Sequence, residues 1–219
     1  MIRLQNLTKT YNIKGQRKTV ANNITQTFPT GSSVALLGRN GAGKSSLLRM
    51  ISGAMLPTSG NIYSTGSISW PVGFGGSFHP ELTGAQNTQF VARIYGINTD
   101  DVLEFVADFA ELGAHFDLPF RTYSSGMRAR LAFGLSMAIP FDTYLIDEVT
   151  AVGDANFRTK SNQVLKGKLE YSSAIVVSHS LGILREICNC GAILENGKMT
   201  FYEDVSDAIT HHMANMDPS

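Results

Sequence analysis

The sequence has no excess of charge of either sign and no long apolar run. Eighteen lysines and arginines balance eighteen aspartates and glutamates, so no broad basic surface predicts binding to nucleic acid. Nowhere do about eighteen apolar residues follow one another, the length that a membrane-spanning helix requires. The first seven residues also lack the apolar stretch of a signal peptide. We therefore expect a protein that remains in the cytosol and does not bind nucleic acid.

Cysteine is equally scarce. Cys188 and Cys190 stand one residue apart, with no second pair and no neighbouring histidine. A structural zinc site needs more ligands than this pair supplies. We expect two buried thiols without a chemical role.

The apolar pattern predicts an α/β protein. The 219 residues allow one large domain or one domain with an inserted subdomain. The first thirty residues predict antiparallel strands with a polar hairpin or loop at 12–18. Helical spacing appears over about 85–113 and 127–137. Short apolar runs predict core strands at 33–37, 144–146, 174–177 and 192–194, the last before a hairpin turn at Asn196 and Gly197. Such alternation predicts a parallel sheet with flanking helices, with the ligand at the carboxyl ends of the strands.

A glycine-rich run between a predicted strand and a predicted helix is the most informative feature. The residues of this run are Gly38, Arg39, Asn40, Gly41, Ala42, Gly43, Lys44 and Ser45, followed by Ser46. The glycines let backbone N–H groups approach phosphate, Lys44 would neutralise the β- and γ-phosphate charge, and Ser45 would be a ligand of Mg²⁺. The alternative is a chance glycine-rich turn before a helix. We predict that these residues form a P-loop that binds ATP with Mg²⁺.

Two carboxylates, Asp147 and Glu148, follow the predicted strand at 144–146. Asp147 is predicted to hold Mg²⁺, directly or through water, and Glu148 to polarise the attacking water as a general base. An acidic pair after a strand is, taken alone, more often the start of a solvated loop. The P-loop upstream favours the catalytic interpretation.

His179 comes two residues after the predicted strand at 174–177. It would lie beside Glu148 if the two strands are neighbours in the sheet, and we interpret it as a catalytic residue that senses the γ-phosphate. A lone histidine after a strand usually has no catalytic role.

Ser124, Ser125 and Gly126 precede a predicted helix. Their hydroxyls and backbone N–H groups suit a terminal phosphate, and the helix dipole adds to this. By itself, a serine at this place is an ordinary helix N-cap.

The order of these motifs resembles that of the ATP-binding subunit of ABC transporters, over nearly the whole chain. The resemblance implies a single ABC-type ATPase domain over residues 1–219, with a helical subdomain inserted at about 85–140. It also implies a homodimer that encloses two ATP molecules, in which the signature segment 123–127 of one copy contacts the ATP held by the other. Tyr11 matches the residue that stacks on adenine, although a tyrosine packing locally would look the same. Asp154 matches the D-loop aspartate at the dimer interface.

The sequence departs from the family pattern in the signature segment and in the glutamine loop. Tyr123, Ser125 and Met127 replace the usual Leu, Gly and Gln, so the phosphate contact of the last position is in doubt.

No glutamine occurs at 69–80, where the family usually has one, and Gln86 lies too far downstream. Which residue senses Mg²⁺ and couples to the membrane subunit is therefore open, and His79 and Ser77 are two candidates.

The segments 68–73, 79–84, 121–127 and 146–154 together resemble the polysaccharide-exporting ABC group, and Ser69-Trp70-Pro71 resembles capsular polysaccharide exporters of Gram-negative bacteria. This implies a peripheral ATPase at the cytoplasmic face of the inner membrane, with an integral membrane permease and accessory envelope export proteins as partners. O-antigen exporters often have a further carbohydrate-binding domain, for which this length leaves no room. Export of O-antigen or teichoic acid, a soluble ABC-type ATPase, and a module that holds ATP without cleaving it stay open as alternatives.

Overall fold

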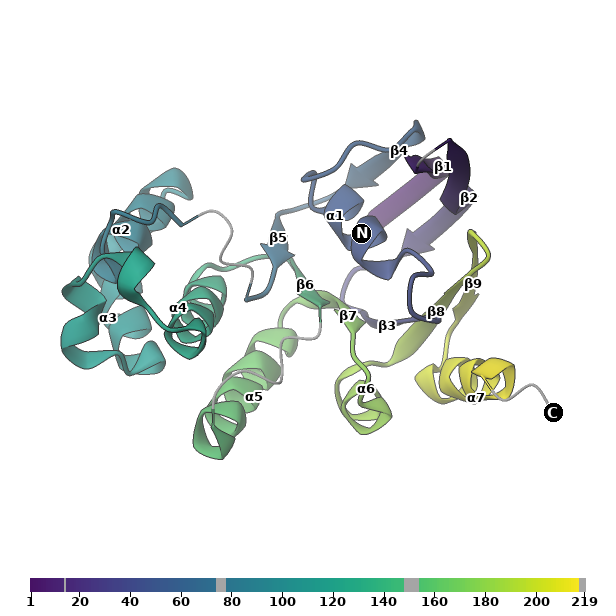
Figure 1. Ribbon diagram of the computed structural model, residues 1–219. Helices are drawn as coiled ribbons and strands as arrows, with labels where there is room; N and C mark the ends of the chain where they lie inside the picture. The colour runs from purple at the N-terminus through teal and green to yellow at the C-terminus, as the bar shows by residue number, and fades with distance from the viewer. Residues whose placement is uncertain (14, 74–77, 148–153, 217–219) are drawn as a thin grey trace. The chain divides into compact units, whose positions relative to one another are not determined.

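The computed structural model describes residues 1–13, 15–73, 78–147 and 154–216. The chain forms two compact units (Figure 1). The first contains both sheets and comprises Met1–Pro71, Phe141–Glu148 and Leu169–Ser219. The second is helical and comprises Val72–Pro140 and Val149–Lys168. None of the helices in the described ranges is both long and apolar enough to cross a membrane.

An antiparallel sheet of three strands opens the first unit. Its strands are β1 (Ile2–Ile13), β2 (Gln16–Phe28) and β4 (Ser59–Ser64), in the order β2-β1-β4. The β1–β2 hairpin turns within the polar segment predicted for it, because Ile13 pairs with Gln16. No apolar pattern predicted β4, in which Ile62 is the one aliphatic side chain.

The second sheet has six strands in the order β5-β6-β7-β3-β8-β9. Their bounds are β3 Ser33–Leu37, β5 Ile68–Pro71, β6 Thr143–Asp147, β7 Ser173–Val177, β8 Cys190–Glu195 and β9 Lys198–Tyr202. The first five strands in this order run parallel, and β9 returns antiparallel to β8. All residues of β3 and β7 are buried, which explains why both read as unbroken apolar runs. The predicted α/β fold is confirmed.

Helix α1 (Lys44–Ile51) joins the two sheets into one hydrophobic core. Leu47 and Leu48 are fully buried and belong to a cluster that includes Leu4 of β1, Leu36 of β3 and Ile175 of β7. Burial of each leucine contributes about 2 kcal/mol. The helix that follows the glycine-rich run is therefore fixed firmly relative to the carboxyl ends of the parallel strands.

The remaining helices of the first unit are α6 (Leu181–Ile187) and α7 (Val205–Met216). Helix α7 packs on β8 at a place where the strand has no side chain. A Cβ at Gly191 would lie 2.3 Å from the Cβ of Ala208, so only glycine permits this approach. The sequence interpretation included neither of these two helices.

Polar side chains form hydrogen bonds between neighbouring segments at the amino-terminal edge of the six-stranded sheet, where its parallel strands begin. Asp142, before β6, accepts hydrogen bonds from the backbone N–H (2.7 Å) and the hydroxyl (2.8 Å) of Ser67, before β5. These two bonds lower the pKa of Asp142. Along the same edge, Ser173 accepts from the N–H of Gly31 at 2.8 Å, and Asn189 accepts from the N–H of Ser33 at 3.0 Å.

The helical unit is built around Phe109. Its elements are α2 (Gly84–Ile94), α3 (Thr99–Ala110), the 3₁₀ turns η1 (Gly113–Asp117) and η2 (Phe120–Thr122), α4 (Ser125–Ala138) and α5 (Ala155–Leu169). The Phe109 ring packs against Phe133 of α4 at 5.5 Å and Phe157 of α5 at 5.2 Å between centroids. Gly134 lets α3 and α4 approach, since a Cβ there would lie 3.0 Å from the Phe109 ring. The helices predicted near 85–113 and 127–137 are confirmed.

Candidate nucleotide-binding site

The carboxyl ends of β3, β6 and β7 bring the predicted motifs together. Asp147, the last residue of β6, pairs with Val177 of β7, and β7 also pairs with β3, which leads into the glycine-rich loop. The strands that precede Glu148 and His179 are neighbours, so the condition for placing His179 beside Glu148 is met. Glu148 itself lies outside the described residues.

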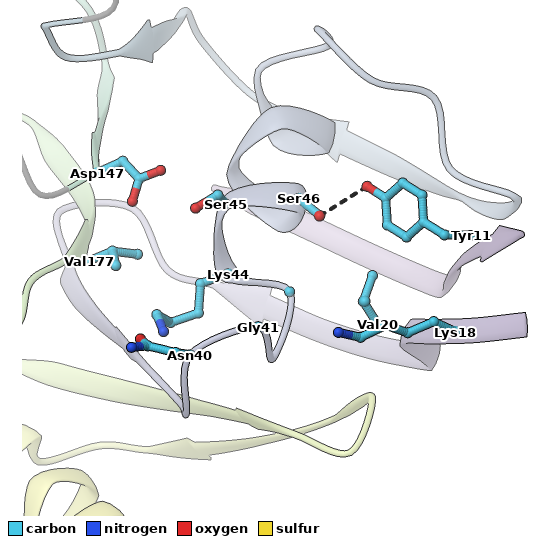
Figure 2. Close-up of a pocket in the computed structure, with 11 residues that line it drawn as sticks. Tyr11, Lys18, Val20, Asn40, Gly41, Lys44, Ser45, Ser46, Asp147 and Val177 are labelled. Carbon is cyan, nitrogen blue, oxygen red and sulfur yellow. Dashed lines mark hydrogen bonds between the residues drawn. The ribbon is translucent and has the colours of Figure 1, made fainter. Parts of the chain in front are cut away.

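A hollow of about 420 Å³ opens at this edge of the sheet (Figure 2). Its lining residues come from β1, β2, the glycine-rich loop, α1 and the ends of β6 and β7. They are Tyr11, Lys18, Val20, Asn40, Gly41, Gly43, Lys44, Ser45, Ser46, Asp147 and Val177. Most residues predicted to bind nucleotide or metal in this unit thus surround one space.

The loop depends on glycine at two points. Gly38 has φ +146, and a Cβ there would lie 2.3 Å from the carbonyl oxygen of Leu194 in β8. Gly43 has φ +110, and a Cβ there would lie 2.7 Å from the Cβ of Val20 in β2. Other residues would meet both steric overlap and an unfavourable backbone conformation.

Lys44 extends back over the loop from which it comes. Its ammonium donates to the carbonyl of Gly38 at 2.7 Å and to that of Arg39 at 3.3 Å. The N–H of Ala42 donates to the same Arg39 carbonyl at 3.0 Å, which closes a tight turn. The cation is therefore held against the mouth of the loop, where a phosphate would meet it.

The amino end of α1 differs from those of α2, α4 and α6. In these three, Thr83, Ser124 and Ser180 at the N-cap accept a hydrogen bond from a first-turn N–H. In α1 the N-cap is Gly43, which offers no side-chain acceptor. Helix N-terminal N–H groups need acceptors from outside the helix, and a phosphate supplies them. The start of α1 fits an anionic ligand.

Two oxygen donors suited to Mg²⁺ face the hollow. Figure 2 shows the Ser45 hydroxyl and the Asp147 carboxylate turned toward the same space. Elsewhere in the described ranges, no three His, Cys, Asp or Glu side chains come together as a metal site. Mg²⁺ keeps several waters and binds through one or two carboxylates together with substrate phosphates, so this sparse donor set fits it.

The Tyr11 ring lines the hollow in a fixed orientation. Its hydroxyl hydrogen-bonds to the Ser46 hydroxyl at 3.0 Å and contacts the Met55 sulfur at 3.1 Å. The Lys9 ammonium lies 5.3 Å from the ring centroid. Tyr11 thus packs locally and also presents an aromatic surface to the hollow, so both interpretations of this residue are compatible with the structure.

A second hollow of about 430 Å³ shares Lys44 and Val177 with the first. His179 lines it, together with Gly38 of the loop and His212 of α7. Burial lowers the pKa of His212, and the positive charge of Lys44 lowers it further. Sequence patterns gave no indication that α7 comes close to the loop.

Comparison with known proteins identifies the family of this chain. A sequence model described as "ABC transporter" matches residues 21–151, more than half of the chain. The chain belongs to the ABC transporter family. It is therefore a member of a family of nucleotide-binding ATPases.

Two relatives of this ABC protein match almost their full length. The polysialic acid transport ATP-binding protein KpsT of Escherichia coli is 49% identical over 215 residues, covering 97% of this chain and 96% of that protein. The capsule polysaccharide export ATP-binding protein CtrD of Neisseria meningitidis serogroup B is 44% identical over 212 residues, covering 97% and 98%. A dimeric structure of the ATP-binding cassette MJ0796 with ADP and Pi has a TM-score of 0.79 at 23% identity, covering 94% and 99%, and shows the shared fold.

The ABC signature segment opens α4 in the helical unit. Ser124, Ser125 and Gly126 are exposed, and the Ser124 hydroxyl accepts from the N–H of Met127 at 3.3 Å. Tyr123, in place of the family's leucine, is buried and donates its hydroxyl to the carbonyl of His115 at 2.7 Å. The aromatic substitution is thus accommodated in the core with its polar atom satisfied.

The predicted D-loop aspartate, Asp154, caps α5 by accepting from the N–H of Phe157 at 2.9 Å. Its carboxylate also forms an ion pair with Arg130 at 2.8 Å. The hydrogen bond from Phe157 and the charge of Arg130 lower the pKa of Asp154. The helix cap and the ion pair within the chain are enough to explain an aspartate at this position. Its role at a dimer interface stays a prediction.

The region of the missing glutamine loop is partly described. Ser77 lies outside the described residues. The His79 ring nitrogen Nδ1 accepts from the N–H of Glu81 at 3.3 Å, within a turn. Gln86 accepts from the N–H of Thr83 at 2.9 Å and completes a capping box at the start of α2. Gln86 therefore has a structural role, which accounts for a glutamine at that place.

Proposed function

We propose that this chain is the ATP-hydrolysing subunit of an ABC transporter that exports capsular polysaccharide across the inner membrane. The observation that carries the substrate class is the near full-length similarity to proteins named for polysialic acid transport and for capsule polysaccharide export. The hollow with its glycine loop, Lys44 and Asp147 supports the ATP-driven part of the proposal.

The residues around the hollow have distinct proposed roles. Lys44 and the backbone N–H groups of residues 38–46 hold the phosphates, and the Tyr11 ring stacks on the adenine. Ser45 and Asp147 hold Mg²⁺. When bound, Mg²⁺ offsets the negative charge that the phosphates carry during transfer to water.

Hydrolysis itself is assigned to Glu148 and His179. Glu148 follows Asp147 directly, and as general base it would accept a proton from the attacking water. His179 contacts the terminal phosphate. The hollow that His179 lines shares Lys44 and Val177 with the nucleotide hollow. This supports the assignment.

Two copies are proposed to act together as a homodimer. The exposed Ser124, Ser125 and Gly126 of one copy would contact the ATP held by the other, and Asp154 would lie at their interface. ATP would favour the closed pair because it contacts both copies, and cleavage would remove that link.

A separate permease in the inner membrane is the proposed partner, with this chain on its cytoplasmic face and accessory envelope proteins beyond. Helix α2 supports a docking surface in the helical unit. Phe90 is 55% exposed, Ile94, one helical turn later, is 63% exposed, and Tyr95 is 44% exposed. Such neighbouring apolar side chains on a surface helix are typical of an interface.

The test is ATP turnover of the chain purified together with its membrane subunit. In Glu148→Gln we expect turnover to fall at least about a hundredfold while ATP binding persists, because the base is lost and the binding groups remain. Glu170→Gln, an exposed site with no assigned role, serves as the matched control.

Export is tested in capsulated cells that lack their own export ATPase. Wild-type chain with its permease should restore polymer at the surface, and Glu148→Gln should leave it inside the cell. Unchanged turnover in Glu148→Gln would contradict the assigned base. Full ATPase activity without any co-purifying membrane subunit would favour the soluble ATPase instead.

A further inference from the structure

Lys18 is a second cation at the nucleotide hollow that none of the sequence motifs includes. It lies on β2 directly opposite Tyr11 of β1 in the antiparallel ladder. Side chains that face each other across a ladder lie on the same side of the sheet. The pairing therefore places a positive charge beside the aromatic ring proposed to bind adenine.

The alternation of β2 separates Lys18 from its neighbours. Lys18 and Val20 both line the hollow. Thr19, between them, instead exchanges a hydrogen bond with the Thr10 hydroxyl at 3.0 Å. Because successive side chains of a strand point to opposite faces, Arg17 belongs with Thr19 and does not line the hollow. Of the two basic residues of β2, only Lys18 therefore lies on the face that lines the hollow.

The Lys18 ammonium reaches the phosphate-binding loop. A Cβ at Gly41 would lie 3.6 Å from its Nζ atom. Figure 2 shows the side chain running from β2 toward Gly41. The ammonium therefore lies next to the backbone of the loop at Gly41.

The described residues around Lys18 do not neutralise its charge. Among the described residues, no ion pair involves its ammonium. The neighbouring Lys9 is different, because its ammonium donates to the carbonyl of Leu56 at 2.8 Å and lies over the Tyr11 ring. Among the described residues that line the hollow, two are lysines, Lys18 and Lys44, and one is a carboxylate, Asp147, which is assigned to the metal. The local charge favours an anion.

We propose that Lys18 binds the phosphate groups of the nucleotide, as a contact from β2 that adds to Lys44 of the P-loop. This inference rests on the proposed binding of ATP in the hollow. An ammonium on a flexible stem acts as a movable point charge, which suits a polyphosphate better than a neutral ribose or base. Its contribution is smaller than that of Lys44, because Lys18 is exposed and water screens its charge.

The test is equilibrium binding to the full-length chain of ATP, ADP and adenosine, in competition with a fluorescent ATP derivative and without turnover. In Lys18→Gln we expect the dissociation constant for ATP to rise about three- to tenfold and that for ADP to rise less. Adenosine should bind as it does to the wild type. Lys18→Arg should restore most of the ATP affinity.

Arg17→Gln is the matched control, since it removes the same charge from the adjacent position on the other face of β2. It should bind ATP like the wild type, and thermal unfolding should show that all variants fold. The salt dependence of ATP binding should also weaken in Lys18→Gln and not in Arg17→Gln.

Three outcomes would overturn the inference. Equal ATP affinity of wild type and Lys18→Gln would mean that Lys18 is only a surface lysine, with the proposed function intact. An equal loss for adenosine would assign Lys18 to the ribose or base. A wild-type chain that does not bind ATP would remove both this inference and the proposed function.

Discussion

Polar residues have opposite uses at the amino-terminal and the carboxyl-terminal edge of the six-stranded sheet, that is, where its parallel strands begin and where they end. At the amino-terminal edge, Asp142 and Ser67 bond to each other, and Ser173 accepts from the N–H of Gly31. At the carboxyl-terminal edge, the Ser45 hydroxyl and the Asp147 carboxylate face an open hollow. The first edge satisfies its polar groups within the chain, and the second presents them to a ligand.

This difference shows where stability and function are separated in the protein. Groups that bond to the chain itself contribute to the free energy of unfolding and leave nothing for a ligand. Groups arranged around glycines, as at Gly38 and Gly43, cost stability and provide a binding surface. Substitutions at the two edges should therefore change different measured quantities.

The largest effect is expected for Gly43→Ala at the carboxyl-terminal edge. Alanine would require φ near +110 and would place its Cβ 2.7 Å from Val20. We expect ATP affinity to fall more than about thirtyfold and the free energy of unfolding to drop by about 2 kcal/mol. Calorimetric ATP binding and urea unfolding measure these changes.

Gly53→Ala is the control for Gly43→Ala, because Gly53 also has a positive φ, +77, with open space around it. It should lose about 1 kcal/mol from backbone strain alone and bind ATP normally. If Gly43→Ala bound ATP as tightly as Gly53→Ala, the loop geometry would not be what holds the phosphates.

An intermediate effect is expected at Ser124, where a cap and a proposed phosphate contact use one hydroxyl. Ser124→Ala should lower the free energy of unfolding by about 1 kcal/mol, because the cap to Met127 is lost. Ser124→Asn keeps a cap acceptor and should retain that stability. Both should lower turnover of the transporter complex by about ten- to a hundredfold.

Normal turnover in Ser124→Asn would mean that Ser124 serves only as a cap. Turnover of the complex and thermal unfolding of the same samples separate the two roles, since one variant changes both quantities and the other changes turnover alone.

The smallest effect is expected for Asp142→Asn at the amino-terminal edge. Hydrogen bonds from Ser67 lower the pKa of Asp142 in the folded chain, so its ionised form is stabilised by folding. This stability is present above the unfolded pKa of about 4 and is lost as the pH falls through the lower folded pKa. We expect a loss of about 1 kcal/mol at pH 7, kept small by the exposure of this carboxylate.

The measurement for Asp142→Asn is urea unfolding at pH 7 and at steps down to pH 3. The difference between wild type and variant should shrink toward the acidic end. A difference that stays constant with pH would show that the ionisation of Asp142 does not cause the loss of stability. ATP binding should be unchanged, since the edge that carries the hollow is untouched.

Contiguous motifs made much of the site predictable from sequence. The glycine run, Asp147 and His179 each follow an apolar strand, and buried parallel strands read as short apolar runs. The order of strands in the sheet follows from such a pattern only in part, and the β6–β7 pairing that joins Asp147 to the neighbourhood of His179 had to be seen in the structure.

Features that depend on contacts between distant segments were not predictable. Strand β4 lies in a segment rich in Gly and Ser, and it forms because β1 supplies its hydrogen-bond partners. Lys18 lines the hollow because it pairs with Tyr11. The bulges of the β1–β2 hairpin set this register. His212 reaches the second hollow because Gly191 admits α7 to β8. No local pattern encodes any of these.

The two cysteines have a practical consequence for following this protein in motion. Both thiols are buried, and burial raises the pKa of Cys188 to about 12 and also that of Cys190. At neutral pH both thiols therefore stay protonated, whereas the thiolate is the form that reacts with alkylating dyes. A fluorophore or spin label can therefore be attached to a cysteine introduced at a chosen exposed site while the native pair stays in place and silent.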